Sequence, residues 1–428
     1  MDTRILRSLA YEYNAIAHDE HNRQRVSLHK SVNSLRMIRP VVLIDELPWS
    51  EMNTDGELTL HCQDPVLREA ELFMRREIYK FKHLRADMIV RPYLPVPKVI
   101  SSTGDGVNVI ENTLATDVDN RIISHEYIDQ FADGANLEML RVPAITYDAD
   151  ETDRRYQLIG SIIGDILPLK KTGIDYMTMH PWDDISRYRS VTPLLVDLAE
   201  RPEFSHKLAR RVFDIGMAEA EQYLKLGLYE NDPWNLHCTP ILCDELYPNG
   251  FTGEHTDFST IWGRGTAQIF GAVSKDMHEE FDISYQIETI GRCGLVYYGC
   301  CEPLDRKIDM VEKIPNLRKV SITPWADVQI AAEAIGKRYV LSSKPNPAAV
   351  AVPVLDTVEL RREISGILEA CAKNGCSCDI VLKDISTCHR NPQNIFMTRI
   401  TTYSSFMYLP DDQSHIHRRE KVVRITYR

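Results

Sequence analysis

Two groups of residues with metal-binding side chains follow predicted strands of this sequence. They are Cys300, Cys301 and Glu302 in the first group, and Cys388 and His389 in the second. Thiolate, imidazole and carboxylate groups are the zinc ligands of proteins, and catalytic sites combine three of them with an open position. If the two strand ends meet in one cavity, Cys300 and Cys388 would bind zinc together with Glu302 or His389. The alternative interpretation is that these residues pack under loops, because free cysteine is among the most buried residue types.

Other residues with reactive or aromatic side chains also follow predicted strands or turns. Lys344 and Asp384 each come at a strand end, and we expect a catalytic role for them beside Glu302 and His389. The expected substrate-binding residues are Asp45, Glu46, Trp49, Trp262, Trp325 and His237. His237 and Cys238, with Cys243, form a weaker candidate ligand group after a possible strand at 234–236. Ion pairing for the charged residues and core packing for the tryptophans are the alternative explanations.

The composition is that of a globular protein rather than a disordered, collagen-like or coiled-coil one. The chain has 428 residues, of which 43% are hydrophobic and 26% charged. Its formal net charge of −12 argues against a broad nucleic-acid-binding face, which would need clustered positive charge. No stretch approaches the roughly 20 apolar residues of a membrane helix, and the first residues lack the apolar segment of a signal peptide. We therefore expect a cytoplasmic protein, whose cysteines remain thiols or metal ligands.

Strands and helices alternate in the C-terminal half. Apolar runs predict strands at 295–298, 319–322, 339–341 and 380–382, and helical patterns lie at 305–314, 326–336, 357–373 and 393–408. Such alternation with short links is typical of a parallel sheet. Reactive residue types gather at the carboxyl ends of these strands, where barrel enzymes place their chemistry. The predicted fold is therefore α/β, a (β/α)8 TIM-type barrel, with a doubly wound sheet as the alternative.

The N-terminal half is expected to complete this barrel. Residues 1–38 have a helical pattern and are predicted as an N-terminal helical extension, which leaves 39–428 as a single barrel domain. Within that domain, 41–44 and 87–90 are predicted strands, and 64–84 and 202–228 are predicted helices. The polar, glycine-punctuated segment at 99–150 is predicted to be an insertion.

Motifs of several common enzyme classes are absent. The sequence has no GxxxxGK[ST] loop, no GxGxxG after a strand, no GxSxG turn and no HExxH helix. These absences argue against a P-loop kinase, a simple dehydrogenase, an α/β-hydrolase and a zincin protease.

The segment from Leu295 to Asn394 resembles the uroporphyrinogen decarboxylase superfamily, which includes cobalamin-dependent methyltransferases of anaerobes. The resemblance lies in YGCCE at 298–302, SITPWAD at 321–327, SKPNP at 343–347, KDISTC at 383–388 and PQN at 392–394. It implies a single barrel. True decarboxylases of this superfamily have an arginine-rich N-terminal stretch, where this chain has the acidic Asp45 and Glu46, so porphyrinogen decarboxylation is disfavoured.

The resemblance also implies a zinc site. Zinc-binding methyltransferases of this superfamily use His-x-Cys and a later cysteine. In this chain Tyr298 stands at the histidine position, Cys300 at the first cysteine and Cys388 at the second. Glu302 or His389 would then replace the histidine, or zinc would be absent.

The resulting hypothesis is a corrinoid-dependent methyltransferase. It would move a methyl group between a small methylated compound, such as a methoxylated aromatic, a methylamine or a methylthiol, and a separate corrinoid protein, with zinc activating the heteroatom. Trp262 and Trp325 would line the rim on which that partner docks. The alternatives are a lyase acting on another carboxylated substrate with Lys344 as anion anchor, and a barrel that binds a corrinoid or tetrapyrrole without turnover. A homodimer is left open.

Overall fold

The computed structural model describes residues 1–84, 86–114, 123–132, 137–246 and 255–388. Its N-terminal segment is helical as predicted, with α1 (Asp2–Ala17) and α2 (Glu20–Asn33). The Asp19 side chain accepts a hydrogen bond from the backbone N–H of His21 and so caps α2. The apolar face of α1 buries Leu6 and Tyr13 against α4 (Pro65–His83) and α5 (Ala149–Ile163). This cluster is separate from the larger core around the sheet.

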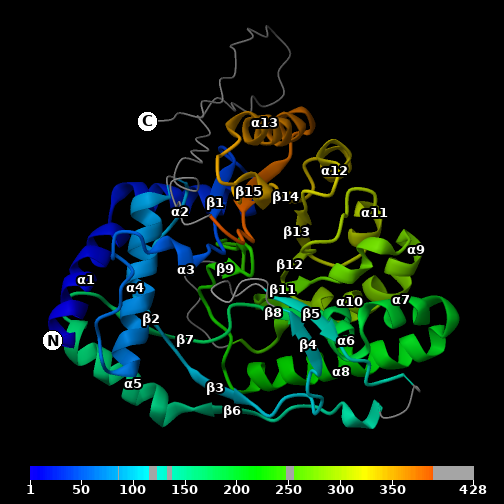
Figure 1. Cartoon of the computed structure of the whole chain (residues 1–428), viewed down its shortest axis with the longest axis horizontal. Helices are drawn as coiled ribbons and strands as arrows, with labels where there is room; N and C mark the ends of the chain where they lie inside the picture. The colour runs from blue at the N-terminus through cyan, green and yellow to red at the C-terminus, as the bar shows by residue number, and fades with distance from the viewer. Residues whose placement is uncertain (85, 115–122, 133–136, 247–254, 389–428) are drawn as a thin grey trace, which may run out of the picture.

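A seven-stranded parallel sheet forms the centre of the molecule (Figure 1). In spatial order its strands are β1 (Val41–Ile44), β15 (Ser377–Leu382), β14 (Val340–Ser343), β13 (Leu317–Ile322), β12 (Leu295–Tyr298), β11 (Trp262–Gly265) and β8 (Met177–Met179). All five strands predicted from the apolar runs at 41–44, 295–298, 319–322, 339–341 and 380–382 are present. Nearly every residue in them is buried, as expected of parallel strands covered on both faces.

The strand order favours a TIM-like arrangement over a doubly wound one. Strands β8 and β11 to β15 follow one another in space in the order of the sequence, and the first strand, β1, pairs with the last, β15. A doubly wound sheet instead reverses its order at a switch point. The described residues thus form a mixed α/β fold, and closure of the sheet between β1 and β8 into an eight-stranded barrel stays a prediction.

Helices link the C-terminal strands and lie along the outside of the sheet (Figure 1). The predicted helices at 326–336 and 357–373 are confirmed as α12 (Val328–Ile335) and α13 (Thr357–Asn374). Asp327 and Asp356 cap their first turns, and Gly375 ends α13 in the left-handed conformation that favours glycine. The helix predicted at 393–408 lies outside the described residues.

Other helices cover the remaining part of the sheet. They are α3 (Trp49–Met52), α6 (Pro181–Arg189), α7 (Val191–Glu200), α8 (Pro202–Lys225), α9 (Lys275–His278), α10 (Ser284–Glu288) and α11 (Ile308–Val311). α8 confirms the helix predicted after Pro202. α11 is shorter than the predicted 305–314.

The predicted strand at 87–90 is wrong. The backbone N–H of Asp87 donates to the carbonyl of Val42 at 2.7 Å, but the Asp87 carboxylate then accepts the N–H of Val42 at 2.9 Å. A side chain therefore takes the place of the backbone acceptor, and no ladder forms along β1.

The segment at 99–150 contains short strands on the periphery, as the scattered apolar residues suggest. They are β3 (Val99–Ser102) with β6 (Ile145–Asp148), and β4 (Glu111–Leu114) with β5 (Ser124–Tyr127). β2 (Leu94–Pro97) precedes this segment and pairs with β7 (Leu169–Thr172), which follows it. In the described part of the chain, no helix is long and apolar enough to cross a membrane.

Candidate metal centre

A two-residue hairpin turn presents His237 and Cys238 at the end of the sheet. The turn joins β9 (Asn235–Leu236) to β10 (Thr239–Pro240), which pair antiparallel. His237 has a φ of 42°, a left-handed conformation uncommon for a residue other than glycine. Such conformations cluster at functional sites, where the surrounding structure holds them in place. The turn therefore fixes two adjacent ligand-type side chains on the same rigid loop.

Cys300 approaches the same place from the other side. It follows β12 after Gly299, whose φ is 101° and whose position leaves no room for a side chain: a Cβ there would lie 2.7 Å from Leu304 Cδ1. The backbone N–H of Cys300 donates to Oε2 of Glu302 at 3.0 Å. The chain thus turns sharply at the carboxyl end of β12, and the turn is held by a carboxylate two residues later.

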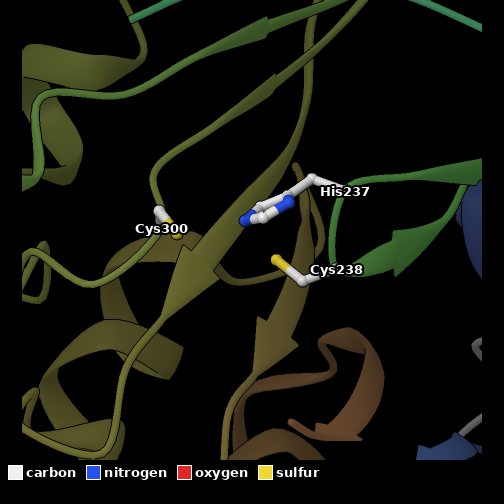
Figure 2. Close-up of side chains that lie close together, drawn as sticks. All are labelled: His237, Cys238 and Cys300. Carbon is white, nitrogen blue, oxygen red and sulfur yellow. The ribbon is translucent and has the colours of Figure 1, made fainter. Parts of the chain in front are cut away.

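Figure 2 shows the three side chains pointing toward one another across a small gap. One ligand atom each of His237, Cys238 and Cys300 lies within 4.8 Å of the other two. Thiolates bound at about 2.3 Å to a tetrahedral ion stand about 3.7 Å apart. A small inward movement therefore brings the three ligands into zinc geometry. One imidazole and two thiolates leave a fourth position open, which is the arrangement of catalytic rather than structural zinc.

The surroundings of His237 keep its imidazole unprotonated. His237 is partly exposed, and the loss of solvent on its packed side, together with the positive charges of Arg264 and Lys383, lowers the pKa of His237 to about 4. The imidazole is therefore neutral at physiological pH and keeps a free lone pair, as a metal ligand must.

The two thiols are protonated in the metal-free cluster. A hydrogen bond with Cys300, followed by burial, raises the pKa of Cys238 well above its usual value. For Cys300, the hydrogen bond with Cys238 lowers the pKa, but the hydrogen bond with Cys301 and burial raise it to about 12 overall. The Cys300 and Cys301 sulfurs are 3.8 Å apart. A metal ion binding here must displace two protons.

This protonation pattern predicts how zinc affinity changes with pH. Because both thiols titrate above neutrality and His237 titrates near 4, zinc should displace two protons between pH 6 and 8. The association constant should rise about 100-fold per pH unit, roughly tenfold for each proton. Competition with a chelator of known pH dependence measures this slope. A slope of one proton would exclude one of the thiols, and a slope of three would show that His237 is protonated in this range.

Two of the ligands expected from the sequence lie elsewhere. The backbone N–H of Cys388 donates to Glu51 at 2.8 Å, and Cys388 does not belong to the ligand cluster. The Glu302 carboxylate is buried and accepts hydrogen bonds from Thr266, the N–H of Ala267 and the N–H of Cys300. Glu302 therefore positions the turn behind Cys300. His389 lies outside the described residues.

The candidate histidine ligand lies on the hairpin rather than on β12. Tyr298 is buried, donates to Asp282 at 2.6 Å and contacts His278 at 2.7 Å, away from the thiols. His237 was predicted as a substrate-binding residue, and it lies in the ligand cluster together with Cys238. In the sequence, His237 and Cys238 are two adjacent residues of metal-binding type after a possible strand. The sequence pattern predicts them only as a weaker ligand group than Cys300 with Cys388.

Asp384 and Lys344, which were predicted to be catalytic, and Glu46, which was predicted to bind substrate, lie near the cluster together with Lys383. Lys383 forms an ion pair with Asp384 at 2.6 Å and lies 3.7 Å from Glu46. Burial raises the pKa of Glu46 to about 8. Lys344 is buried and donates to Ser342 Oγ at 2.6 Å. These groups ring the carboxyl ends of β1, β14 and β15.

The predicted substrate-binding aromatics are placed less favourably. Trp262 is fully buried in an apolar cluster with Cys238 and Tyr297, so a docking partner has no access to it. This corrects the prediction that Trp262 lies on the rim. Trp325 is 71% exposed after β13 and is available on that surface. Trp49 begins α3, where Arg76 lies 4.7 Å from its ring.

A cavity of about 440 Å³ lies beside the hairpin. Asp45, at the end of β1, lines it together with Trp234, Asn235 and residues of α4. Its volume is in the range of small-molecule sites. Of the acidic residues that replace the arginine-rich stretch of decarboxylases, Asp45 therefore faces space that a ligand could occupy.

Of the comparisons with known proteins, the search of solved structures finds distant similarity. No family model matches the chain, and no curated protein matches it. The structure is similar to that of a methyltransferase from Methanosarcina mazei, with a TM-score of 0.45 and 10% identity over 86% of this chain and 94% of that chain.

Proposed function

We propose that the protein is a corrinoid-dependent methyltransferase with a zinc centre. It would move a methyl group between a small methylated substrate and a separate corrinoid protein. The observation that supports this proposal is the convergence of His237, Cys238 and Cys300 at the carboxyl end of the sheet, with a fourth position open. Barrel enzymes place their chemistry at this end.

The donor set fits zinc better than a hard cation. Two sulfurs and one imidazole nitrogen are borderline-soft ligands, whereas magnesium and calcium require oxygen. Zinc bound there would supply Lewis acidity to the heteroatom that gains or loses the methyl group.

The chain's own residues would bind and orient the reactants. Glu302 fixes the turn that carries Cys300, and Lys319 donates to Thr239 and to the carbonyl of Pro240, which holds the hairpin against β13. The ligands are thus fixed from both sides, and the barrier falls mainly through positioning. The corrinoid partner would dock over the open strand ends, where Trp325 is exposed.

The experiment is a methyl-transfer assay with free cob(I)alamin and a panel of methoxylated aromatics, methylamines and methylthiols. We expect methylcobalamin, followed by its absorption spectrum, with at least one of these donors. Cys300→Ser should lower the rate about 100-fold or more, since loss of a ligand should exceed the 10–100-fold cost of losing an outer-shell partner. Cys243→Ser is the matched control, because Cys243 is buried beside Cys238 but is no member of the ligand cluster.

Two outcomes would contradict this proposal. Equal rates for Cys300→Ser and Cys243→Ser would show that the cluster has no part in the reaction. Turnover of a carboxylated substrate without any corrinoid would favour the lyase alternative instead.

A further inference from the structure

Cys301 is an exposed thiol directly beside the candidate metal centre. All ten cysteines of the chain lie among the described residues, and Cys301 alone of them is exposed. It follows Cys300, with 3.8 Å between the two sulfurs, but it does not belong to the ligand cluster. A small oxidant in solution therefore reaches this sulfur first, because exposure helps to decide which thiols are oxidised.

Cys300 and Cys238 continue the line of sulfurs into the interior. Cys300 is 2% exposed and Cys238 is 1% exposed. Their side chains are hydrogen-bonded to each other, and their sulfurs lie within 4.8 Å. Figure 2 shows Cys238 on the hairpin facing Cys300 across the gap. Cys300 thus has one sulfur on its solvent side and one on its inner side. Because disulfides exchange by direct attack of one sulfur on another, this order allows a disulfide to pass inward.

A bond between Cys300 and Cys301 would be strained, since the two residues are neighbours in the chain. Disulfide-bonded residues usually have Cα atoms at least about 4.4 Å apart, whereas consecutive Cα atoms are about 3.8 Å apart. Strain makes a disulfide easier to reduce, and Cys238 is the thiol in position to do so. Cys238 lies on a different loop from Cys300, so chain connectivity imposes no such strain on a bond between them. Exchange therefore favours the inner pair.

We infer that Cys301, Cys300 and Cys238 form an oxidation relay, which starts at the exposed thiol and ends in a disulfide between Cys238 and Cys300. The oxidant is a peroxide. Hydrogen peroxide converts the Cys301 thiol to a sulfenic acid and releases one water. The Cys300 thiol then attacks the Cys301 sulfur, so that an S–S bond forms and a second water leaves. Finally the Cys238 thiol attacks the Cys300 sulfur, and Cys301 leaves as a thiol with the proton of Cys238. In total, the sulfurs of Cys238 and Cys300 give two electrons to one peroxide.

The consequence for the site is the loss of two of its three candidate ligands. A metal ion is bound by the thiolate form of cysteine, and the sulfurs of a disulfide carry no such charge. Only the His237 imidazole would remain. This consequence rests on the proposed function, because it assumes that the cluster binds zinc, whereas formation of the disulfide does not. A dithiol reductant should restore both ligands by exchange.

A second group of neighbouring cysteines provides a control within the same chain. The Cys371 side chain is hydrogen-bonded to those of Cys376 and Cys378. Each of these three residues is at most 2% exposed, and the one exposed cysteine of the chain belongs to the relay. We therefore expect the Cys371 group to stay reduced under conditions that oxidise the relay.

The test is peptide mapping of the folded, metal-free full-length protein after brief exposure to hydrogen peroxide. Free thiols are alkylated, and fragmentation in the mass spectrometer assigns the linked cysteines. We expect a Cys238–Cys300 disulfide with Cys301 alkylated. Cys301→Ser should slow its formation at least about tenfold, because the buried thiols lose their exposed entry point. Cys243→Ser is the matched control and should react at the wild-type rate, since Cys243 is buried beside Cys238 but is no member of the cluster.

Three results would overturn the inference. They are a wild-type rate in Cys301→Ser, a lasting Cys300–Cys301 bond with Cys238 still free, and oxidation of the Cys371 group as fast as that of the relay. In the zinc-loaded protein, peroxide should release zinc as the disulfide forms. The mapping needs neither zinc nor methyl transfer, so a disulfide formed in a protein that lacks both would leave the relay standing while the proposed function fails. Methyl transfer by a protein that forms no disulfide would have the opposite meaning.

Discussion

Cys238→Ser and Cys300→Ser should each bind zinc more than about 100-fold more weakly than the wild type. Each substitution removes one of only three ligands and replaces a thiolate with a hydroxyl, which is a poor ligand for zinc at neutral pH. Outer-shell partners alone change metal affinity 10–100-fold, so a direct ligand should exceed that range. His237→Gln should have a similar effect, since the imidazole is the only nitrogen donor of the cluster. Metal content and chelator competition measure these affinities.

The informative control is Cys388→Ser. Cys388 is buried as deeply as the two ligands, and the sequence pattern favours it over Cys238, yet its backbone lies against Glu51. We therefore expect zinc affinity in Cys388→Ser within a factor of about three of the wild type. Retention of zinc in Cys238→Ser combined with loss in Cys388→Ser would restore the ligand set predicted from the sequence and refute the cluster seen here.

The sequence predicts the outer framework of this fold well, because local signals and burial agree there. Each of β12 to β15 contains a short apolar run, and Asp356 and Gly375, whose residue types mark helix ends, cap α13. Tertiary contacts only reinforce these elements. Where a side chain replaces a backbone partner, as Asp87 does beside β1, the apolar pattern predicts a strand that does not form.

The site is less predictable, because its members meet only through the topology. The hairpin with His237 and Cys238 and the turn with Cys300 are about sixty residues apart, and no local pattern places them opposite each other. The sequence pattern predicts Cys388 as a ligand because it also follows a strand. The direction of the loop after that strand cannot be predicted from the pattern, and in the structure the loop places the backbone of Cys388 against Glu51. β11 was missed altogether, since a short run of tryptophan, glycine and arginine has little of the composition of a strand. β11 also carries Arg264, whose burial only the folded structure shows.

Lys319→Met should destabilise the protein by about 3–5 kcal/mol, the cost of leaving one partner of a buried ion pair alone. Both Lys319 and Asp379 are fully buried, and the lysine also donates to Thr239 and to Pro240 of the hairpin that carries His237 and Cys238. Without it, the Asp379 carboxylate keeps its hydrogen bonds from Ser342 and Thr239 but loses its counter-charge. Urea unfolding followed by circular dichroism, at one protein concentration, measures the change.

The double variant Lys319→Met with Asp379→Leu separates charge from packing. If the loss comes from an uncompensated carboxylate, removing both charges should restore most of the stability, since well-packed apolar replacements of a buried pair are often neutral. The hairpin would still lack its two hydrogen bonds from Lys319, so zinc should bind the double variant more weakly than the wild type even where the free energy of unfolding recovers.

A change of less than about 1 kcal/mol in the free energy of unfolding of Lys319→Met would contradict this account, because it would mean that Asp379 finds another cation or takes up a proton at little cost. Recovery of stability without recovery of zinc affinity would show two separate roles for Lys319. Its charge stabilises the fold by pairing with Asp379, and its hydrogen bonds to Thr239 and Pro240 position the hairpin.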